Sequence, residues 1–266
     1  MEVITSKANE KVKFIKSLND KKARKMNNVF YLEGIKVVEE VINNVKAIDI
    51  MFIAYSDEIL NNINGGKKFL NLIKVLELEN DINILNIKKE IFESITDTKT
   101  PQGVLAVIKI KKYDIDDILK EDKILLLDKI QDAGNIGTII RTADAFNVKG
   151  IICMENTVDV YSPKVVRSTM GSILREKIIY IKSEDLFGLK KYGHILYGTS
   201  LSSNKYIEDI NFSKKSIFVL GNEANGISEE VEKVCDSLVK IKMSGNAESL
   251  NVAIAAGIIL HAQYMK

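Results

Sequence analysis

The chain has 266 residues, of which 46% are hydrophobic and 28% are charged. This composition excludes an intrinsically disordered chain and suffices for one large or two ordinary globular domains. Its 38 lysines and arginines nearly balance 36 acidic residues, so the net charge of +2 does not by itself indicate a nucleic-acid partner. A basic binding surface therefore has to be local.

The sequence also limits the compartment and the cofactor class. No run of about 18 uncharged apolar residues occurs, and the first residues lack the pattern of a secretory signal, so we expect a cytoplasmic protein with no membrane partner. Two cysteines and two histidines without ligand spacing predict neither a disulfide framework nor a metal site. The glycine patterns of dinucleotide-binding and P-loop proteins are absent as well.

The first predicted element is a helix over residues 6–27 that concentrates positive charge. Within the first 27 residues, eight lysines and arginines stand against three acidic residues. Such a surface suits a phosphate backbone, which makes Lys22, Arg24 and Lys25 candidate nucleic-acid contacts. A solvated helix face with no ligand is the alternative that charge alone leaves open.

The remainder of the first half alternates short apolar runs with helical patterns. Strands are predicted at 29–32, 49–54 and 104–110, and helices at 34–45 and 67–76. The charged stretch 111–122 contains few apolar residues and is predicted to be a linker. The predicted domains are therefore residues 1–110 and residues 123–266.

The second half alternates strand and helix patterns more regularly. Strands are predicted at 124–127, 150–154, 178–180, 194–199, 216–220 and 237–241, and helices at 135–146, 163–172, 184–191, 229–234 and 248–264. This order predicts an α/β fold with a mainly parallel sheet and helices on both faces. Ligands in such sheets bind beyond the carboxyl ends of the strands, so the segments that follow strands are the candidate site.

Three polar clusters that contain glycine follow predicted strands. Residues 132–137 run into a helix, residues 220–228 follow an apolar strand, and residues 241–251 precede a helix rich in small residues. Free N–H groups at a helix start and the close approach that glycine permits both suit a bound ligand. Taken singly, each cluster also fits a helix cap, an ordinary turn or close helix packing.

Together and in this order, the clusters resemble the motifs of the SpoU (TrmH-like) RNA ribose 2′-O-methyltransferases. Asn135-x-Gly137-x-x-x-Arg141 is similar to the first motif, residues 220–228 to the second, and residues 249–252 to the third. Ala133 and Lys242 stand where the family often has proline. Both replacements are expected to loosen loops without removing a side chain that the chemistry requires.

The resemblance extends beyond these motifs. Residues 161–171 are similar to a recurrent family segment, and residues 30–34 and 98–104 are similar to the small substrate-binding domain of many members. That domain is similar to ribosomal-protein folds that bind kinked RNA. The resemblance therefore implies a small N-terminal α/β RNA-binding domain and a C-terminal, mainly parallel sheet with a deep trefoil knot of the SPOUT type.

The resemblance also implies the methyl donor and the site residues. S-adenosylmethionine is expected at Thr199, Leu220, Gly221, Ile241, Met243 and Leu250. The catalytic set is expected to comprise Asn135, Arg141, Glu223, Ser249 and Asn251. RNA is expected to contact Lys164 and Arg167 in addition to the basic helix. Family members are homodimers, so a dimer through the C-terminal domain is expected, and whether Arg167 acts across it stays open.

Residue chemistry indicates a role for Arg141, one of only four arginines in the chain. A guanidinium stays protonated, so we expect it to bind the RNA phosphate and stabilise the forming alkoxide rather than accept a proton. Asn135 is expected to orient Arg141 and the ribose, and Ser249 and Asn251 to hold the motif loops. The proton acceptor stays open, with Glu223 as one candidate.

The predicted activity is transfer of a methyl group to a ribose 2′-hydroxyl, in 23S ribosomal RNA and on a guanosine. Two alternatives stay open at this point. One keeps the reaction but takes transfer RNA as substrate, and the other is a non-catalytic RNA-binding protein on the same scaffold. Binding of S-adenosylmethionine separates the last from the first two.

Overall fold

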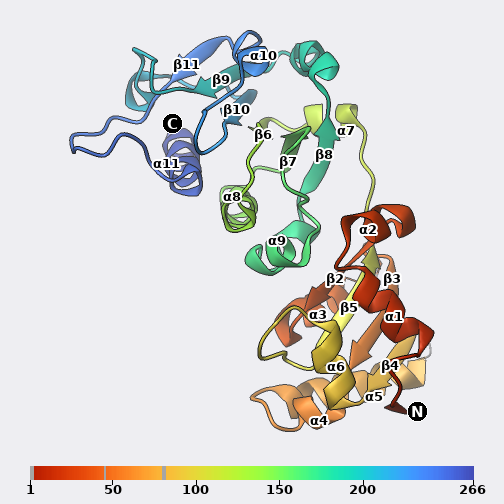
Figure 1. The fold of residues 1–266 in the computed structure, drawn as a ribbon. Coiled ribbons are helices and arrows are strands. Elements are labelled where there is room, and N and C mark those ends of the chain that lie inside the picture. The colour runs from red at the N-terminus through yellow and green to blue at the C-terminus, as the bar shows by residue number, and fades with distance from the viewer. Residues whose placement is uncertain (1–2, 45, 80–81) are drawn as a thin grey trace. The chain divides into compact units, whose positions relative to one another are not determined.

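The structure is a computed structural model that describes residues 3–44, 46–79 and 82–266. It divides into two compact units: residues up to 111 together with Tyr161–Gly171, and Lys112–Val160 together with Ser172–Lys266 (Figure 1). The segment 161–171, predicted to belong to the C-terminal domain, is thus grouped with the first unit. Val45, the last residue of the helix predicted over 34–45, lies outside the described residues.

The first unit is built on a mixed five-stranded sheet in the order β1-β4-β3-β5-β2. Its strands are β1 (Val3–Ile4), β2 (Val29–Glu33), β3 (Ile50–Tyr55), β4 (Ile84–Ile87) and β5 (Val104–Lys109). Its helices are α1 (Glu10–Ser17), α2 (Lys21–Asn27), α3 (Ile35–Asn43), α4 (Asp57–Leu60), α5 (Gly66–Glu79), α6 (Lys89–Ile95) and α9 (Pro163–Ser168). Strand β5 runs antiparallel to both β2 and β3, whereas β4 pairs in parallel with β1 and β3.

The basic N-terminal segment forms two helices, so the prediction of one helix over 6–27 is wrong. Helix α1 ends at Ser17, with Leu18 as its C-cap. The side chain of Asp20 then accepts the N–H of Lys22 at 2.6 Å, which starts α2. Arg24 is only 3% exposed, and its Nη1 donates to the carbonyl of Leu18 at 2.6 Å. Arg24 therefore holds α2 against the end of α1.

The second unit is built on a six-stranded sheet in the order β11-β9-β10-β6-β7-β8. Its strands, all parallel to their neighbours, are β6 (Lys123–Leu127), β7 (Gly150–Met154), β8 (Lys177–Ile181), β9 (Ile195–Thr199), β10 (Ser216–Leu220) and β11 (Ser237–Val239). Its helices are α7 (Ile115–Leu119), α8 (Ala133–Ala145), α10 (Glu229–Glu232) and α11 (Val252–Tyr264), with 3₁₀ helices η1 (Ser172–Leu174), η2 (Ser183–Lys190) and η3 (Ile207–Asp209).

Helices cover both faces of this sheet, as the strand–helix alternation predicts. Helices α7, η2 and α10 contribute to one apolar core with alternate residues of the strands. Helices α8 and α11 lie side by side (Figure 1), and Gln263 of α11 donates to Ser216 at the start of β10. Helix α7 contributes Ile118 and Leu119 to the core, so the stretch predicted as a linker is part of the second unit.

Two elements of the second unit differ from their predictions in type or by more than two residues at an end. The segment predicted as a helix over 184–191 is the 3₁₀ helix η2. Helix α11 begins at Val252 rather than at residue 248, because Asn251 is its N-cap and accepts the N–H groups of Ala253 and Ile254. Within the described part of the chain, no helix combines the length and the hydrophobicity needed to cross a bilayer.

A buried carboxylate lies beside the start of β8. Glu176 is 4% exposed, and its Oε1 pairs with Lys149 at 3.1 Å, while Lys149 also pairs with Asp144 of α8 at 3.2 Å. Burial raises the pKa of Glu176 to about 7. The ionised form is therefore disfavoured in the folded state relative to the unfolded chain.

We predict that Glu176→Gln stabilises the protein at pH 8. Because the folded pKa lies above the unfolded one, the favourable contribution of Glu176 is present below pH 4.5 and is lost as the pH rises to 7. The variant should gain at most about 3 kcal/mol above pH 7, at about 1.4 kcal/mol per unit of pKa difference, because it also loses the ion pair with Lys149. Urea denaturation at several pH values measures the gain, and equal stability of the two proteins at pH 8 contradicts the assignment.

Candidate active site

Sheet topology brings the predicted motifs together at one edge of the second unit. The chain leaves β6 towards β7 and β8 on one side, whereas β10 and β9 lie on the other side of β6. The strand order therefore reverses between β6 and β10, and in a parallel sheet a crevice forms beyond the carboxyl ends of strands at such a point. The first motif follows β6 and the second follows β10.

Asn135 joins all three motifs through its side chain. Its Nδ2 donates to Glu223 Oε1 at 2.9 Å, and its Oδ1 accepts from Asn251 Nδ2 at 3.0 Å. Its position is fixed by the start of α8, where Asp132 is the N-cap and accepts the N–H of Asn135 at 2.8 Å. Since Asn251 also caps α11, the starts of both helices and the loop after β10 are held in one hydrogen-bonded chain.

The loop after β10, residues 221–228, closes tightly on itself. The backbones of Asn222 and Gly226 exchange two hydrogen bonds of 2.9 Å. A Cβ atom added to Gly221 would lie 2.1 Å from the carbonyl carbon of Gly226 and 2.2 Å from the nitrogen of Ile227. Only glycine therefore fits at position 221 while the loop keeps this conformation.

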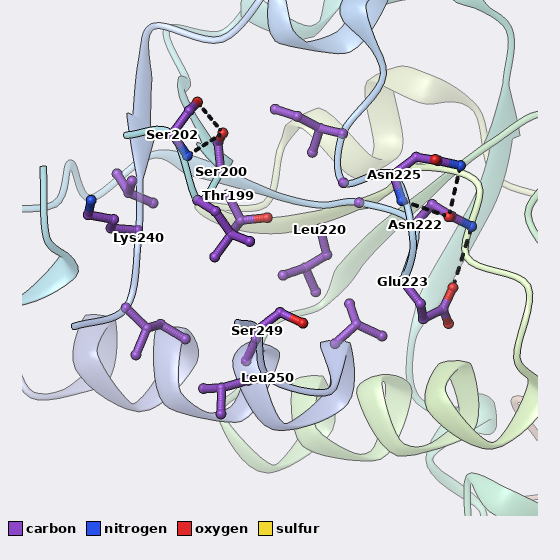
Figure 2. Close-up of a pocket in the computed structure, with 18 of the residues that line it drawn as sticks. Thr199, Ser200, Ser202, Leu220, Asn222, Glu223, Asn225, Lys240, Ser249 and Leu250 are labelled. Atoms are coloured by element: carbon purple, nitrogen blue, oxygen red, sulfur yellow. Dashed lines mark hydrogen bonds between the residues drawn. The ribbon is translucent and has the colours of Figure 1, made fainter. Parts of the chain in front are cut away.

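A cavity of about 550 Å³ lies between this loop, the ends of β9 and β11, and α11 (Figure 2). It is lined by all six residues predicted to hold the cofactor: Thr199, Leu220, Gly221, Ile241, Met243 and Leu250. Glu223 and Ser249 line it too, whereas Asn135, Arg141 and Asn251 do not belong to its lining. The cavity thus adjoins the chain of polar side chains at Glu223.

The cavity suits a cofactor that has both apolar and polar parts. Leu220, Val239 and Leu250 provide apolar walls, and the hydroxyl groups of Ser200, Ser202 and Ser249 are available along its lining. Its volume lies within the range of about 300–1,000 Å³ that is usual for small-molecule sites. These residues fit an adenosine with an attached amino acid, whose base needs apolar contacts and whose polar groups need hydrogen bonds.

Several lining residues were not predicted. Ser200 and Ser202 follow β9 and hydrogen bond to each other at 2.8 Å (Figure 2). The side-chain oxygen of Asn222 accepts the N–H groups of Ala224 and Asn225. The run of serines directly after a predicted strand was the available signal for the first pair. The sequence around Asn222 did not distinguish it from an asparagine in an ordinary turn.

Arg141 occupies a different side of α8 from Asn135. Six residues along a helix correspond to about 9 Å of rise and to about 120° between the two side chains. Arg141 is exposed, and it forms no hydrogen bond or ion pair with any residue that the structure describes, Asn135 included. The expectation that Asn135 orients Arg141 is therefore wrong for this structure, in which Asn135 binds Glu223 and Asn251.

The candidate RNA contacts fall into three groups. Lys22 and Lys25 are exposed and line a shallow depression with Met26 on α2, and Lys164 is exposed on α9. Arg167 donates to Asp97 and to Thr98, at 3.3 Å each, within the first unit. The structure corrects the expectation for Arg24, because a buried guanidinium that binds a backbone carbonyl is not on an RNA-binding surface.

Comparison with known proteins decides the family. Residues 122–261 match the model of the SpoU rRNA Methylase family, and residues 9–106 match the MRM3-like substrate binding domain. The chain belongs to the SpoU rRNA methylase family. It is an RNA 2′-O-methyltransferase that uses S-adenosylmethionine as methyl donor.

Two relatives of this SpoU protein match it over nearly its whole length, and a third matches it over about three fifths. The 23S rRNA (guanosine(2553)-2′-O)-methyltransferase RlmP of Bacillus subtilis is 30% identical over 98% of both chains. An AdoMet-bound rRNA methyltransferase of Sinorhizobium meliloti superposes with a TM-score of 0.87 at 29% identity, over 99% of this chain and 97% of that one. A 23S rRNA (uridine(2479)-2′-O)-methyltransferase of Streptomyces viridochromogenes is 35% identical over 61% of this chain and 60% of its own.

We predict that Gly221→Ala lowers the affinity for S-adenosylmethionine by at least about tenfold, because the added Cβ displaces the backbone at Gly226 and opens the loop that lines the cavity. Gly245→Ala is the matched control, since a Cβ at Gly245 meets no atom within 4 Å. Isothermal titration calorimetry measures both. Wild-type affinity in Gly221→Ala would show that the loop conformation does not matter for the cofactor.

Proposed function

We propose that this enzyme methylates the ribose 2′-hydroxyl of a guanosine in 23S ribosomal RNA. The proposal is supported by the full-length similarity to an enzyme named for guanosine methylation of 23S rRNA. A relative named for a uridine is similar over a smaller share of both chains. The cytoplasmic location expected from the sequence is part of the same proposal.

One observation carries the proposed site: the hydrogen-bonded chain Asn251–Asn135–Glu223, which meets the cavity at Glu223. S-adenosylmethionine supplies an electrophilic methyl group on a sulfonium. The polar chain holds Glu223 and the starts of two helices in fixed positions beside the cavity, so a ribose can be aligned there without reorganisation of the protein. The knot expected from the resemblance, which would thread the last strands and α11 around this cavity, belongs to the proposal too.

Arg141 is proposed to bind the phosphate next to the reacting ribose and to stabilise the forming alkoxide. Its guanidinium is exposed and unpaired among the described residues, so it is free to form two parallel hydrogen bonds with a phosphate. Oε1 of Glu223 accepts a hydrogen bond from Asn135, and its other oxygen, Oε2, lies 3.5 Å from Nδ2 of Asn222. Glu223 is the proposed acceptor of the hydroxyl proton.

We predict that Arg141→Lys lowers kcat by about 10² and leaves the affinity for S-adenosylmethionine unchanged. Lysine keeps the positive charge but loses the planar pair of donors, and Arg141 does not line the cavity. Single-turnover methylation and calorimetry measure the two quantities separately. A variant that methylates RNA at the wild-type rate would exclude the phosphate-binding role.

The first unit is proposed to bind the RNA substrate. Its match to a substrate-binding domain supports this role, and Lys22, Lys25 and Lys164 are exposed cations that suit a phosphate backbone. Arg167 is proposed to contribute through the N–H groups that its bonds to Asp97 and Thr98 leave unused.

A homodimer through α11 is proposed because this helix exposes a row of apolar residues. Ile254 and Ile258 of α11 and Met265, its C-cap, are 56%, 37% and 68% exposed and recur at a spacing that places them on one side of the helix. A second copy of the same face would cover them.

We predict that Ile254→Lys converts the dimer into a monomer, because a charge would be buried against the partner's apolar face. Leu78→Lys, on α5 and 83% exposed, is the control that adds the same charge elsewhere. Size-exclusion chromatography with light scattering gives the masses. An unchanged dimer in Ile254→Lys would place the interface on another surface.

Methylation of ribosomal and transfer RNA with labelled S-adenosylmethionine tests the substrate. The proposal expects label in 23S rRNA alone, and mapping of the ribose methyl to a guanosine. Label in transfer RNA favours the alternative substrate. Label in neither RNA would contradict both proposed substrates.

A further inference from the structure

The corner that follows β6 holds both ends of the loop that carries Glu223. Asp128 is the first residue after β6, and its N–H donates to the carbonyl of Leu220 at 2.8 Å. Its carboxylate oxygen Oδ2 accepts the N–H of Ser228 at 2.6 Å. Since Leu220 and Ser228 flank residues 221–227, this one residue fixes the distance between the two ends of the loop.

The carboxylate of Asp128 is costly at this place. The side chain is 1% exposed, and its other oxygen, Oδ1, has no hydrogen-bond partner among the residues that the structure describes. A buried carboxylate that is only partly satisfied destabilises a fold relative to an apolar or amide side chain of similar size. Packing alone therefore does not explain why an aspartate stands here. The need for a strong hydrogen-bond acceptor for the N–H of Ser228 does explain it.

The next residue reaches the loop at a third point. Lys129 has a φ of +56°, a backbone conformation that is unfavourable for residues other than glycine and asparagine. In this conformation its carbonyl accepts a hydrogen bond from Nδ2 of Asn222 at 3.0 Å, while Oδ1 of Asn222 accepts the N–H groups of Ala224 and Asn225. Figure 2 shows the contact between Asn222 and Asn225. The corner and Asn222 together define the loop from Gly221 to Ser228.

We propose that Asp128 is a positioning residue for cofactor binding and for the methyl transfer. It acts through the loop 221–228, whose residues 221–227 line the cofactor cavity and whose Glu223 binds Asn135. Without the acceptor at Oδ2, the end of the loop is released, the cavity loses one wall, and Glu223 moves away from Asn135. The inference rests on the proposed site but not on the choice of RNA.

The test compares Asp128→Ala and Asp128→Asn with the wild-type enzyme. Asp128→Ala should weaken S-adenosylmethionine binding by about tenfold, raise KM for the cofactor and leave KM for RNA unchanged. Asp128→Asn keeps an oxygen that accepts the N–H of Ser228, so its affinity should lie between those of Asp128→Ala and the wild type. Amide hydrogen exchange should show faster exchange of Ser228 in Asp128→Ala than in Asp128→Asn.

Ile152→Val is the matched control for a loss of stability. Ile152 is fully buried in β7, so the variant lowers the stability of the same unit without touching the loop, and its cofactor affinity should equal that of the wild type. A folded Asp128→Ala with wild-type affinity and a protected Ser228 amide overturns the proposal. If Asp128→Ala does not fold, an Asp128→Asn variant with wild-type affinity and exchange overturns it instead.

The outcome is separate from that of the proposed substrate. Cofactor affinity and amide exchange are measured without RNA, so a failure to methylate 23S rRNA leaves the role of Asp128 to be decided by these two measurements. Conversely, an enzyme that methylates 23S rRNA but is insensitive to Asp128→Ala in both measurements retains its proposed function and loses this positioning residue.

Discussion

The reversal of strand order between β6 and β10 is the constraint on which the site depends. After β6 and β10, the chain continues to next strands on opposite sides of the sheet, which leaves a crevice beyond the carboxyl ends of these two strands. The first residues after β6 and after β10 lie beside this crevice, and α11 begins there too. Asn135 therefore hydrogen bonds to both Glu223 and Asn251, although Asn251 is 116 residues further along the chain. The cavity next to them follows from the same arrangement.

Much of this was predictable from the sequence, because strand–helix alternation and motif order are local patterns. The strands β6, β7, β9 and β10 lie where their apolar runs indicate, and all six predicted cofactor residues line one cavity. The family resemblance, and not periodicity, supplied the identity of those residues. Hydrophobic periodicity supplied the sheet that brings them together.

What the sequence did not reveal depends on caps and on tertiary contacts. Asp20 and Asn251 set helix starts through side-chain hydrogen bonds to the backbone, and such caps are weaker signals than the helical pattern around them. The burial of Arg24 depends on the carbonyl at the end of α1. The roles inferred for Asp128 and Lys129 rest on contacts with a loop about a hundred residues further along the chain, which no local pattern encodes.

The central claim is that the segments following β9, β10 and β11 form one cofactor site. Amide hydrogen exchange with and without S-adenosylmethionine tests this claim most directly. We predict that binding protects the loops after β9, β10 and β11 together, along with the start of α11. Protection confined to one of these loops, or protection of the first unit in their place, would contradict it.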